Sequence, residues 1–311
     1  MCLKQQDLNI KDTMVSNKKR RWHCLPGQEP TDLDKQVMYW ENKGKLVPTR
    51  DLIKTPEQIE AMKVSGALSK AALRRAGSMI RPGVSTLEID RAVEAFIRLH
   101  GGTPTFKGYG GFPGSVCSSI NEQIVHGIPS ANVILQDGDI LTIDTGATVN
   151  GWAGDNAWTF YCGTVDEKTQ ALCEVTRDCL KAGIAAAVPG ARLGDVGHAV
   201  QKLAEDNGYG VIRDFVGHGI GRNLHEDPEV RNYGRAGNGI VLREGMVIAI
   251  EPMIAMGTYD CTVLENGWTV VTDDGLPSAH YENTVAITAD GPVIVSEDEV
   301  GPWCEMQGGL E

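Results

Sequence analysis

Two amphipathic helices are predicted at the start of the main part of the chain. Thr55-Pro56 places a capping hydroxyl and a proline where a first helix would begin, and the helical pattern continues to about Met79. Pro82-Gly83 interrupts it. Ser85 to Glu88 has the pattern of a capping box, and the apolar face that follows ends at Gly101-Gly102. We therefore expect two helices joined by a Pro-Gly turn.

The same plan recurs 107 residues later in the chain. Pro189-Gly190 corresponds to Pro82-Gly83, and Gly208 corresponds to Gly101. Each half reads as helix, Pro-Gly, helix and then strands. The repeat predicts an α/β (α+β) fold of two pseudo-symmetric halves, with a central antiparallel sheet flanked by helices. A functional site would lie where the halves meet.

A β-hairpin is predicted around Asn150-Gly151, the strongest short signal for a two-residue turn. Ile140 to Thr145 alternates like a half-buried strand before it. In this register Gly146 faces Asp155 across the hairpin. Because side chains alternate between faces, Asp144 and Asp155 share one face, as diagonal neighbours roughly 7 to 8 Å apart. The pattern brings two carboxylates together.

Two other carboxylates stand at the ends of apolar runs. Val247 to Ile250 is a buried-strand pattern that stops at Glu251-Pro252, and Glu282 precedes the strand-like run Thr284 to Thr288. Burying such a carboxylate without compensation costs several kcal/mol. Gly217 to Gly221 surrounds His218 with glycines, which permits close backbone approach.

A second hairpin is predicted at Asn266-Gly267. It separates Thr262 to Leu264 from Trp268 to Val271. We expect this hairpin to extend the same sheet.

Together these positions suggest a metal centre built from four carboxylates and one imidazole. Such an oxygen-rich set holds two divalent metal ions and suits Co, Mn, Fe or Zn better than a thiolate-preferring ion. The candidate ligands are Asp144, Asp155, His218, Glu251 and Glu282.

The sequence resembles the type I methionine aminopeptidases, which are M24 metallopeptidases with the pita-bread fold. The resemblance extends from about Thr55 to Val295. Its segments are Asn121 to Pro129, Ile143 to Asp155, Gly217 to Pro228, Ile250 to Met253 and Ala279 to Thr284. The interval of thirty-one residues from Glu251 to Glu282 lacks the long insertion of the type II enzymes.

This resemblance implies a dinuclear methionyl aminopeptidase that removes the initiator methionine. Asp155 and Glu282 would be shared by both metals, with Asp144 completing one shell and His218 and Glu251 the other. A metal-bridging hydroxide would attack the first peptide bond. Glu251 would also shuttle the proton to the leaving amine.

Substrate-binding residues also follow from the resemblance. His126 and His225 match the family's two non-ligand histidines, which would bind the substrate and stabilise charge on the scissile carbonyl oxygen. The methionine pocket maps onto Tyr109, Phe112, Cys117, Leu224 and Trp268. Leu224 stands where an aromatic residue is common, and Phe106 where smaller residues are usual. Asn156-Ala157 departs from the hydroxyl-bearing residues often found after the second aspartate, so hydrogen bonding around the metals is expected to differ.

Composition agrees with a soluble enzyme. The chain has 311 residues, 41% hydrophobic and 23% charged, without an apolar run long enough to span a membrane. Met1 to Asp12 lacks the apolar core of a secretory signal, so we expect a cytoplasmic protein. Eight cysteines at irregular spacing indicate reduced thiols.

Charge divides the chain unevenly. The net charge of -12 argues against specific DNA binding, although residues 1–49 hold nine Lys or Arg against six Asp or Glu. We expect this segment to be an amino-terminal extension that is flexible or packed on the surface, followed by the catalytic domain, residues 50–300, and a short tail, residues 301–311. Partners would be amino-terminal methionine peptides and nascent chains, with transient ribosome contact through the basic stretch Lys18 to Trp22.

Two other functions remain open at this stage. An Xaa-Pro peptidase of the same fold would require extra histidines around the site and usually a large amino-terminal domain, for which 49 residues are too few. A non-catalytic, ribosome-associated binding protein would have lost ligands, whereas this chain retains all five and both accessory histidines.

Overall fold

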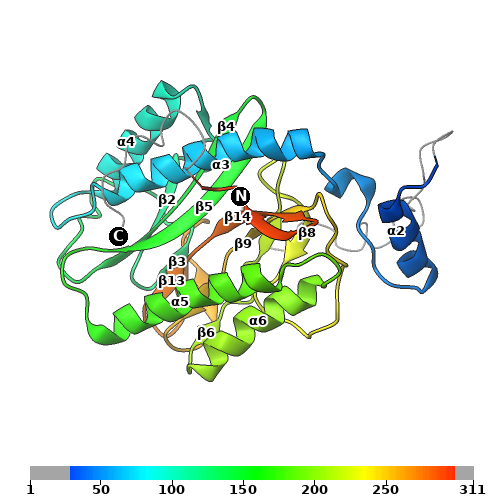
Figure 1. The fold of residues 1–311 in the computed structure, drawn as a ribbon. Helices are drawn as coiled ribbons and strands as arrows, with labels where there is room; N and C mark the ends of the chain where they lie inside the picture. The colour runs from blue at the N-terminus through cyan, green and yellow to red at the C-terminus, as the bar shows by residue number, and fades with distance from the viewer. Residues whose placement is uncertain (1–28, 298–311) are drawn as a thin grey trace.

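The computed structural model describes residues 29–297 as an α/β structure with its helices on one side (Figure 1). The helices are α2 (Asp32–Asn42), α3 (Pro56–Gly77), α4 (Thr86–Leu99), α5 (Glu167–Ala186) and α6 (Leu193–Asp206), with short 3-10 helices η2 (Arg50–Leu52) and η3 (Tyr109–Gly111). The strands are β1 (Thr103–Pro104), β2 (Val116–Ile120), β3 (Gln123–Val125), β4 (Ile140–Val149), β5 (Trp152–Tyr161), β6 (Gly210–Val211), β7 (Gly217–Gly219), β8 (Glu226–Val230), β9 (Val247–Ile250), β10 (Met253–Ala255), β11 (Cys261–Val263), β12 (Val270–Thr272), β13 (Ser278–His280), β14 (Asn283–Thr288) and β15 (Gly291–Ile294).

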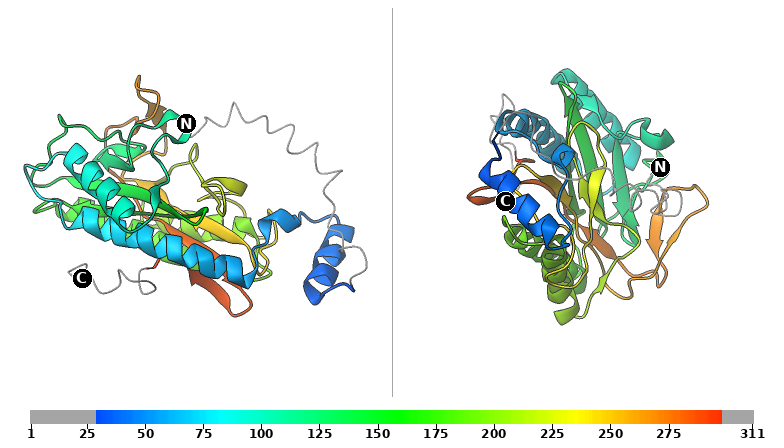
Figure 2. Two further views of the ribbon diagram at one scale, coloured as in Figure 1. Left: turned by 90° about the horizontal axis from the view of Figure 1, so that it is seen from above. Right: turned by 90° about the vertical axis from the view of Figure 1, so that its right-hand side faces the viewer.

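The expected duplication is present in the helices. A shift of 107 residues places α4 on α6, and each helix follows a long helix and a Pro-Gly turn. Thr55 and Ser85 begin α3 and α4 with capping boxes. The two helix pairs cover the same side of the strands, with α3 and α4 over one half and α5 and α6 over the other (Figures 1 and 2).

The hairpin of β4 and β5 has the predicted register. Val149 pairs with Trp152 and Gly146 pairs with Asp155. Asn150 (φ 51°) and Gly151 (φ 75°) both adopt the left-handed conformation that a tight hairpin turn requires. The hairpin therefore carries Asp144 and Asp155 on one face.

The strands form several hydrogen-bonded sheets instead of one. β4 pairs with β1, β2 and β5, while a five-stranded sheet has the order β15-β14-β9-β7-β8. The hairpin expected to extend the first sheet belongs elsewhere, because β12 pairs with β3 and with β11 in a sheet of its own. A register shift between Val270 and Val271 accompanies this pairing. The expectation of a shared sheet was therefore wrong, since alternation in the sequence does not specify the third strand.

Each half has its own apolar core. Leu68, Ile89 and Ile143 are fully buried between α3, α4 and the β4 sheet, and Leu172 and Ile248 between α5, α6 and the β9 sheet. None of the helices within residues 29–297 combines the length and apolar character needed to cross a membrane.

The extension is described only in part. Helix α2 begins with a capping box at Thr31, and Asp34 forms an ion pair with Arg50 at a distance of 2.6 Å. The basic stretch Lys18 to Trp22 and the tail, residues 301–311, lie outside the described residues.

Candidate metal centre and substrate pocket

The five candidate ligands come from both halves of the molecule and meet between them. Asp144 and Asp155 lie on β4 and β5, and His218 lies on β7. Glu251 follows β9 directly, and Glu282 directly precedes β14. Ile250 of β9 pairs with Asn283 of β14, and the two strands are antiparallel. The residues directly beyond this pair, Glu251 and Glu282, therefore lie close together.

Two hydrogen bonds join the halves at this point. The Glu282 backbone N–H donates to the Ala157 carbonyl (2.9 Å). The Thr284 hydroxyl donates to the backbone carbonyl of Asp155 (2.8 Å). The position of Glu282 relative to Asp155 is therefore set by contacts immediately beside both residues.

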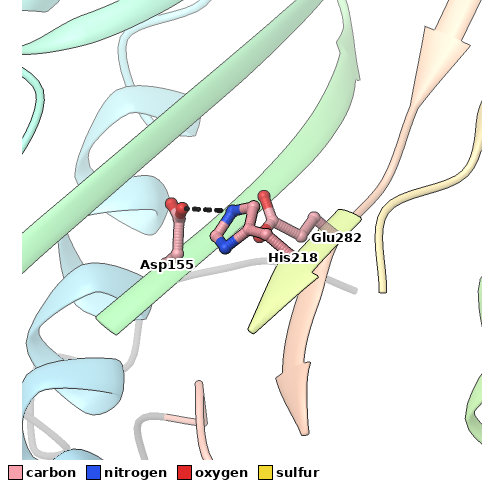
Figure 3. Close-up of side chains that lie close together, drawn as sticks. All are labelled: Asp155, His218 and Glu282. Carbon is pink, nitrogen blue, oxygen red and sulfur yellow. Dashed lines mark ion pairs between the residues drawn. The ribbon is translucent and has the colours of Figure 1, made fainter. Parts of the chain in front are cut away.

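His218 faces the carboxylates with one nitrogen. Its Nδ1 lies 2.9 Å from the Gly219 carbonyl oxygen, which requires a proton on Nδ1 and leaves the Nε2 lone pair free. Nε2 is 3.8 Å from Asp155 Oδ2 and 3.6 Å from Glu251 Oε1. Figure 3 shows the ring between Asp155 and Glu282, and single ligand atoms of the three residues all lie within 4.8 Å of one another.

The cluster of buried carboxyl groups is suited to binding cations. Burial raises the pKa of Asp155 to about 8, and burial with mutual repulsion raises the pKa values of Asp144, Glu251 and Glu282 well above their ordinary range. Asp144 Oδ1, Asp155 Oδ1 and Glu282 Oε1 are buried without a hydrogen-bond partner among the described residues. Burial also lowers the pKa of His218 to about 4, which keeps the imidazole neutral. Unpaired carboxylate oxygens around a neutral imidazole fit divalent metal ions.

The two accessory histidines lie in the same pocket as the carboxylates. His126 has a positive φ of 60°. Burial lowers its pKa to about 4. His225 is accessible from solvent, and its Nδ1 lies 2.8 Å from the Tyr109 hydroxyl. Its ring centroid is 4.2 Å from that of His218, and partial burial together with His218 lowers its pKa.

An apolar wall completes the pocket. Phe112 and Trp268 meet edge to face with centroids 5.1 Å apart. The Cys117 and Leu224 side chains are buried beside them, and Phe106 also lines the pocket. All the residues assigned to the pocket from the sequence therefore lie around one cavity.

Sequence reasoning missed several residues near this site. Phe215 and Met253 line the pocket. His280 is 1% exposed, and its Nε2 lies 3.8 Å from Glu251 Oε2. Neither ring nitrogen of His280 has a hydrogen-bond partner within residues 29–297. The signal was available, because His280 stands two residues before Glu282, a spacing that puts both side chains on one face of an extended segment.

Comparison with known proteins identifies the family. The sequence profile of metallopeptidase family M24 matches residues 60–289. A methionine aminopeptidase from Clostridium acetobutylicum is 49% identical over 245 residues, covering 79% of this chain and 98% of the relative. This chain belongs to the methionine aminopeptidases of family M24.

Solved structures of methionine aminopeptidases have the same fold. The enzyme from Thermotoga maritima is 45% identical, with a TM-score of 0.78 over 79% of this chain and 98% of that chain. The enzyme from Rickettsia prowazekii is 41% identical, with a TM-score of 0.77 over 78% of this chain and 98% of that chain. The predicted family and pita-bread fold are thereby confirmed. As a metallopeptidase family, M24 accounts for the buried cluster of carboxylates and imidazole.

Proposed function

We propose that this chain is a dinuclear aminopeptidase that removes the initiator methionine from nascent proteins and peptides. One observation carries the proposal: five side chains suited to metal binding converge in a pocket with an apolar wall and two further histidines. The methionine aminopeptidase relatives support the same reaction.

The ligand set divides naturally between two cations. Asp155 and Glu282 would be shared, Asp144 would complete the set of one cation, and His218 with Glu251 would complete that of the other. Co, Mn, Fe and Zn ions suit these donors. Bound there, they would supply Lewis-acid chemistry, lowering the pKa of a water molecule and polarising the scissile carbonyl group.

Proton transfer is assigned to Glu251. Its buried carboxylate lies beside His218 and is raised in pKa, so it can take a proton from the attacking water and deliver it to the leaving amine. His126 and His225 are held neutral by their surroundings. A neutral imidazole still carries one N–H, which can donate to the carbonyl oxygen as charge develops on it.

The apolar wall is assigned to the methionine side chain. Phe112, Leu224 and Trp268 offer the contacts that an unbranched thioether needs. Cys117 and Tyr109 complete this subsite. The substrate's free amino group would lie beside Asp144 and the cation that it helps to hold, so only the terminal residue would be removed.

The proposed location and partners follow from the substrate. Because nascent chains are made in the cytoplasm, we propose that the protein acts there. The basic stretch Lys18 to Trp22 would contact the ribosome transiently through its positive charge.

The test is release of free methionine from the peptide Met-Ala-Ser by metal-stripped protein titrated with Mn or Co. Metal-dependent cleavage of Met-Ala-Ser, with Leu-Ala-Ser and Met-Pro-Ser largely spared, is the expected result. Preference for Met-Pro-Ser would assign the chain to the Xaa-Pro peptidases instead. Absence of cleavage with every metal would favour a non-catalytic binding protein.

A further inference from the structure

The loop formed by residues 220–225, here named the His225 loop, joins β7 to β8 and carries two side chains of the pocket. Leu224 and His225 both line the cavity, whereas no helix or strand holds the backbone between β7 and β8. A loop that positions a catalytic imidazole needs anchors, because a displacement of 1 Å can cost about 100-fold in rate.

The first end of the His225 loop is fixed to the β4–β5 hairpin. The Ala153 backbone N–H donates to the Gly221 carbonyl oxygen (2.9 Å). Arg222 stacks over the Trp152 ring at 3.9 Å, and its Nη1 donates to the carbonyl oxygens of Asn150 and Gly151.

The other end of the loop, where β8 begins at Glu226, is held by an ion pair with Lys54, which is far away in the sequence. Lys54 Nζ lies 2.7 Å from Glu226 Oε2, with side-chain exposures of 6% and 17%. The second carboxylate oxygen, Glu226 Oε1, accepts a hydrogen bond from the Asn223 backbone N–H (3.1 Å). Glu226 thus connects Lys54 to the backbone of the loop.

The surroundings of the ion pair leave little freedom. A Cβ atom at Gly221 would lie 2.7 Å from Glu226 Oε1 and 2.8 Å from Lys54 Cε, so the glycine makes room for the pair. The Lys54 backbone N–H donates to the Gly245 carbonyl oxygen (2.7 Å). Lys54 therefore starts from a fixed backbone position beside the segment that leads into β9.

We propose that Lys54 and Glu226 are positioning residues: their buried ion pair holds the His225 loop so that His225 and Leu224 face the substrate. Neither the Lys54 side chain nor the Glu226 side chain lines the substrate pocket, so both act through the loop. This inference rests on the proposed function, in which His225 contacts the scissile carbonyl oxygen.

A double-mutant cycle with His225→Ala tests the inference. Lys54→Met is expected to lower kcat for Met-Ala-Ser about 10- to 100-fold. In the His225→Ala background the same substitution is expected to change kcat less than about twofold, because the group it positions is already absent. Metal affinity, measured by titration calorimetry, should stay unchanged, since no candidate ligand is altered.

Two further variants protect the test. Lys54→Met leaves the buried Glu226 charge unpaired, which destabilises the folded protein. The double variant Lys54→Met/Glu226→Gln removes both charges, and we expect it to fold and to show the same loss of kcat. Lys63→Met is the matched control, because Lys63 forms an ion pair of the same 2.7 Å length with Glu60 on the exposed face of α3. It should retain full activity.

The outcomes are distinct. An equal loss of kcat from Lys54→Met in both backgrounds, or full activity in both the Lys54 variants, would overturn the positioning role. Full activity of His225→Ala alone would instead refute the proposed role of His225. A wild-type protein that cleaves no peptide would refute the proposed function itself.

Discussion

The His218 imidazole illustrates how one backbone contact selects the chemistry of a side chain. The Nδ1–H of His218 donates a hydrogen bond to the Gly219 carbonyl oxygen, so Nε2 presents its lone pair to the carboxylates. At His225 the direction is opposite: the Tyr109 hydroxyl can donate to Nδ1, 2.8 Å away, which puts the ring proton on Nε2, where it can be donated to the substrate's carbonyl oxygen. Two neighbouring imidazoles are thus suited to different tasks, one to a metal and the other to a carbonyl oxygen.

We predict that His225→Ala retains its metals and loses most of its activity. Removing one donor to a developing oxyanion costs about 3 kcal/mol, or roughly a 100-fold loss of kcat. Turnover of Met-Ala-Ser gives kcat, and calorimetric titration of the metal-free variant gives its affinity for Mn. A variant with wild-type kcat would contradict the role, and loss of Mn binding would show that His225 supports the metal centre.

At the scale of elements, the close contact of α3 with β5 sets the position of Asp155. The Ser65 hydroxyl donates to the Trp152 carbonyl oxygen, and the Ser69 hydroxyl donates to the Thr145 carbonyl oxygen. Asn156, which stands where a hydroxyl was expected, donates its side-chain amide to Ser69 Oγ (2.6 Å). The buried amide therefore ties the strand beside Asp155 to the helix.

Gly154→Ala should destabilise the protein and weaken metal binding. A Cβ atom at Gly154 would lie 2.4 Å from the Gly66 backbone nitrogen, and a helix backbone cannot move aside as a side chain can. Overpacking of this kind costs about 1 to 3 kcal/mol of the free energy of unfolding. Urea unfolding measures the loss, and calorimetry with Mn measures the effect on the adjacent Asp155.

Gly77→Ala is the matched comparison on the same interface. The added Cβ atom would meet only the edge of the Phe160 ring, at 2.5 Å. Because a ring can shift more easily than a helix backbone, we expect a smaller destabilisation and unchanged Mn affinity. Equal effects of the two substitutions would mean that backbone contact is not what makes Gly154 necessary.

At the scale of the whole molecule, the two halves are joined across a cluster of like charges. Four buried carboxyl groups have pKa values raised by burial and mutual repulsion, Asp155 to about 8. Without metal the folded protein therefore binds more protons than the unfolded chain between the unfolded pKa values near 4 and the raised folded values. The stability of the metal-free protein must fall as the pH rises through that interval.

We predict that, in the presence of a chelator, the free energy of unfolding decreases between pH 6.5 and pH 8. The decrease should be about 1 to 2 kcal/mol for each carboxyl group that stays protonated in the folded protein over most of this range while it is ionised in the unfolded chain. Burial lowers the pKa values of His126, His218, His225 and His280, so these imidazoles are neutral in the folded protein over this range, whereas about half of each is protonated in the unfolded chain at pH 6.5. Their opposite contribution raises the free energy of unfolding by about 0.4 kcal/mol for each imidazole between pH 6.5 and pH 8, which reduces the decrease without reversing it.

Urea unfolding at the two pH values measures this change. Asp155→Asn should show a smaller decrease, because the group with the pKa of about 8 is gone. Saturating Mn should abolish the decrease, since bound cations compensate the carboxylates. A metal-free protein that is more stable at pH 8 than at pH 6.5 would contradict the assignment of raised pKa values.

Much of the fold could be predicted from the sequence where the signals are local. Capping residues begin α3 and α4 at the expected positions, and the Asn150-Gly151 turn fixes the register that places Asp144 and Asp155 on one face of the hairpin. The duplication could be recognised in the sequence because each half has a Pro-Gly turn between its two helices. The second hairpin was assigned to the wrong sheet, because pairing of β12 with β3 depends on contacts across about 150 residues of chain.

The candidate site shows the same division. The sequence by itself determined which residues could bind metal, because Asp144, Glu251 and Glu282 each stand at a place where a strand pattern would otherwise bury an unpaired charge. Their roles, and those of the two accessory histidines, stay predictions. Only the tertiary structure placed His280 beside Glu251 and paired Lys54 with Glu226. Both contacts join segments that are distant in the chain, and their distances depend on how whole strands and loops pack, which no local pattern encodes.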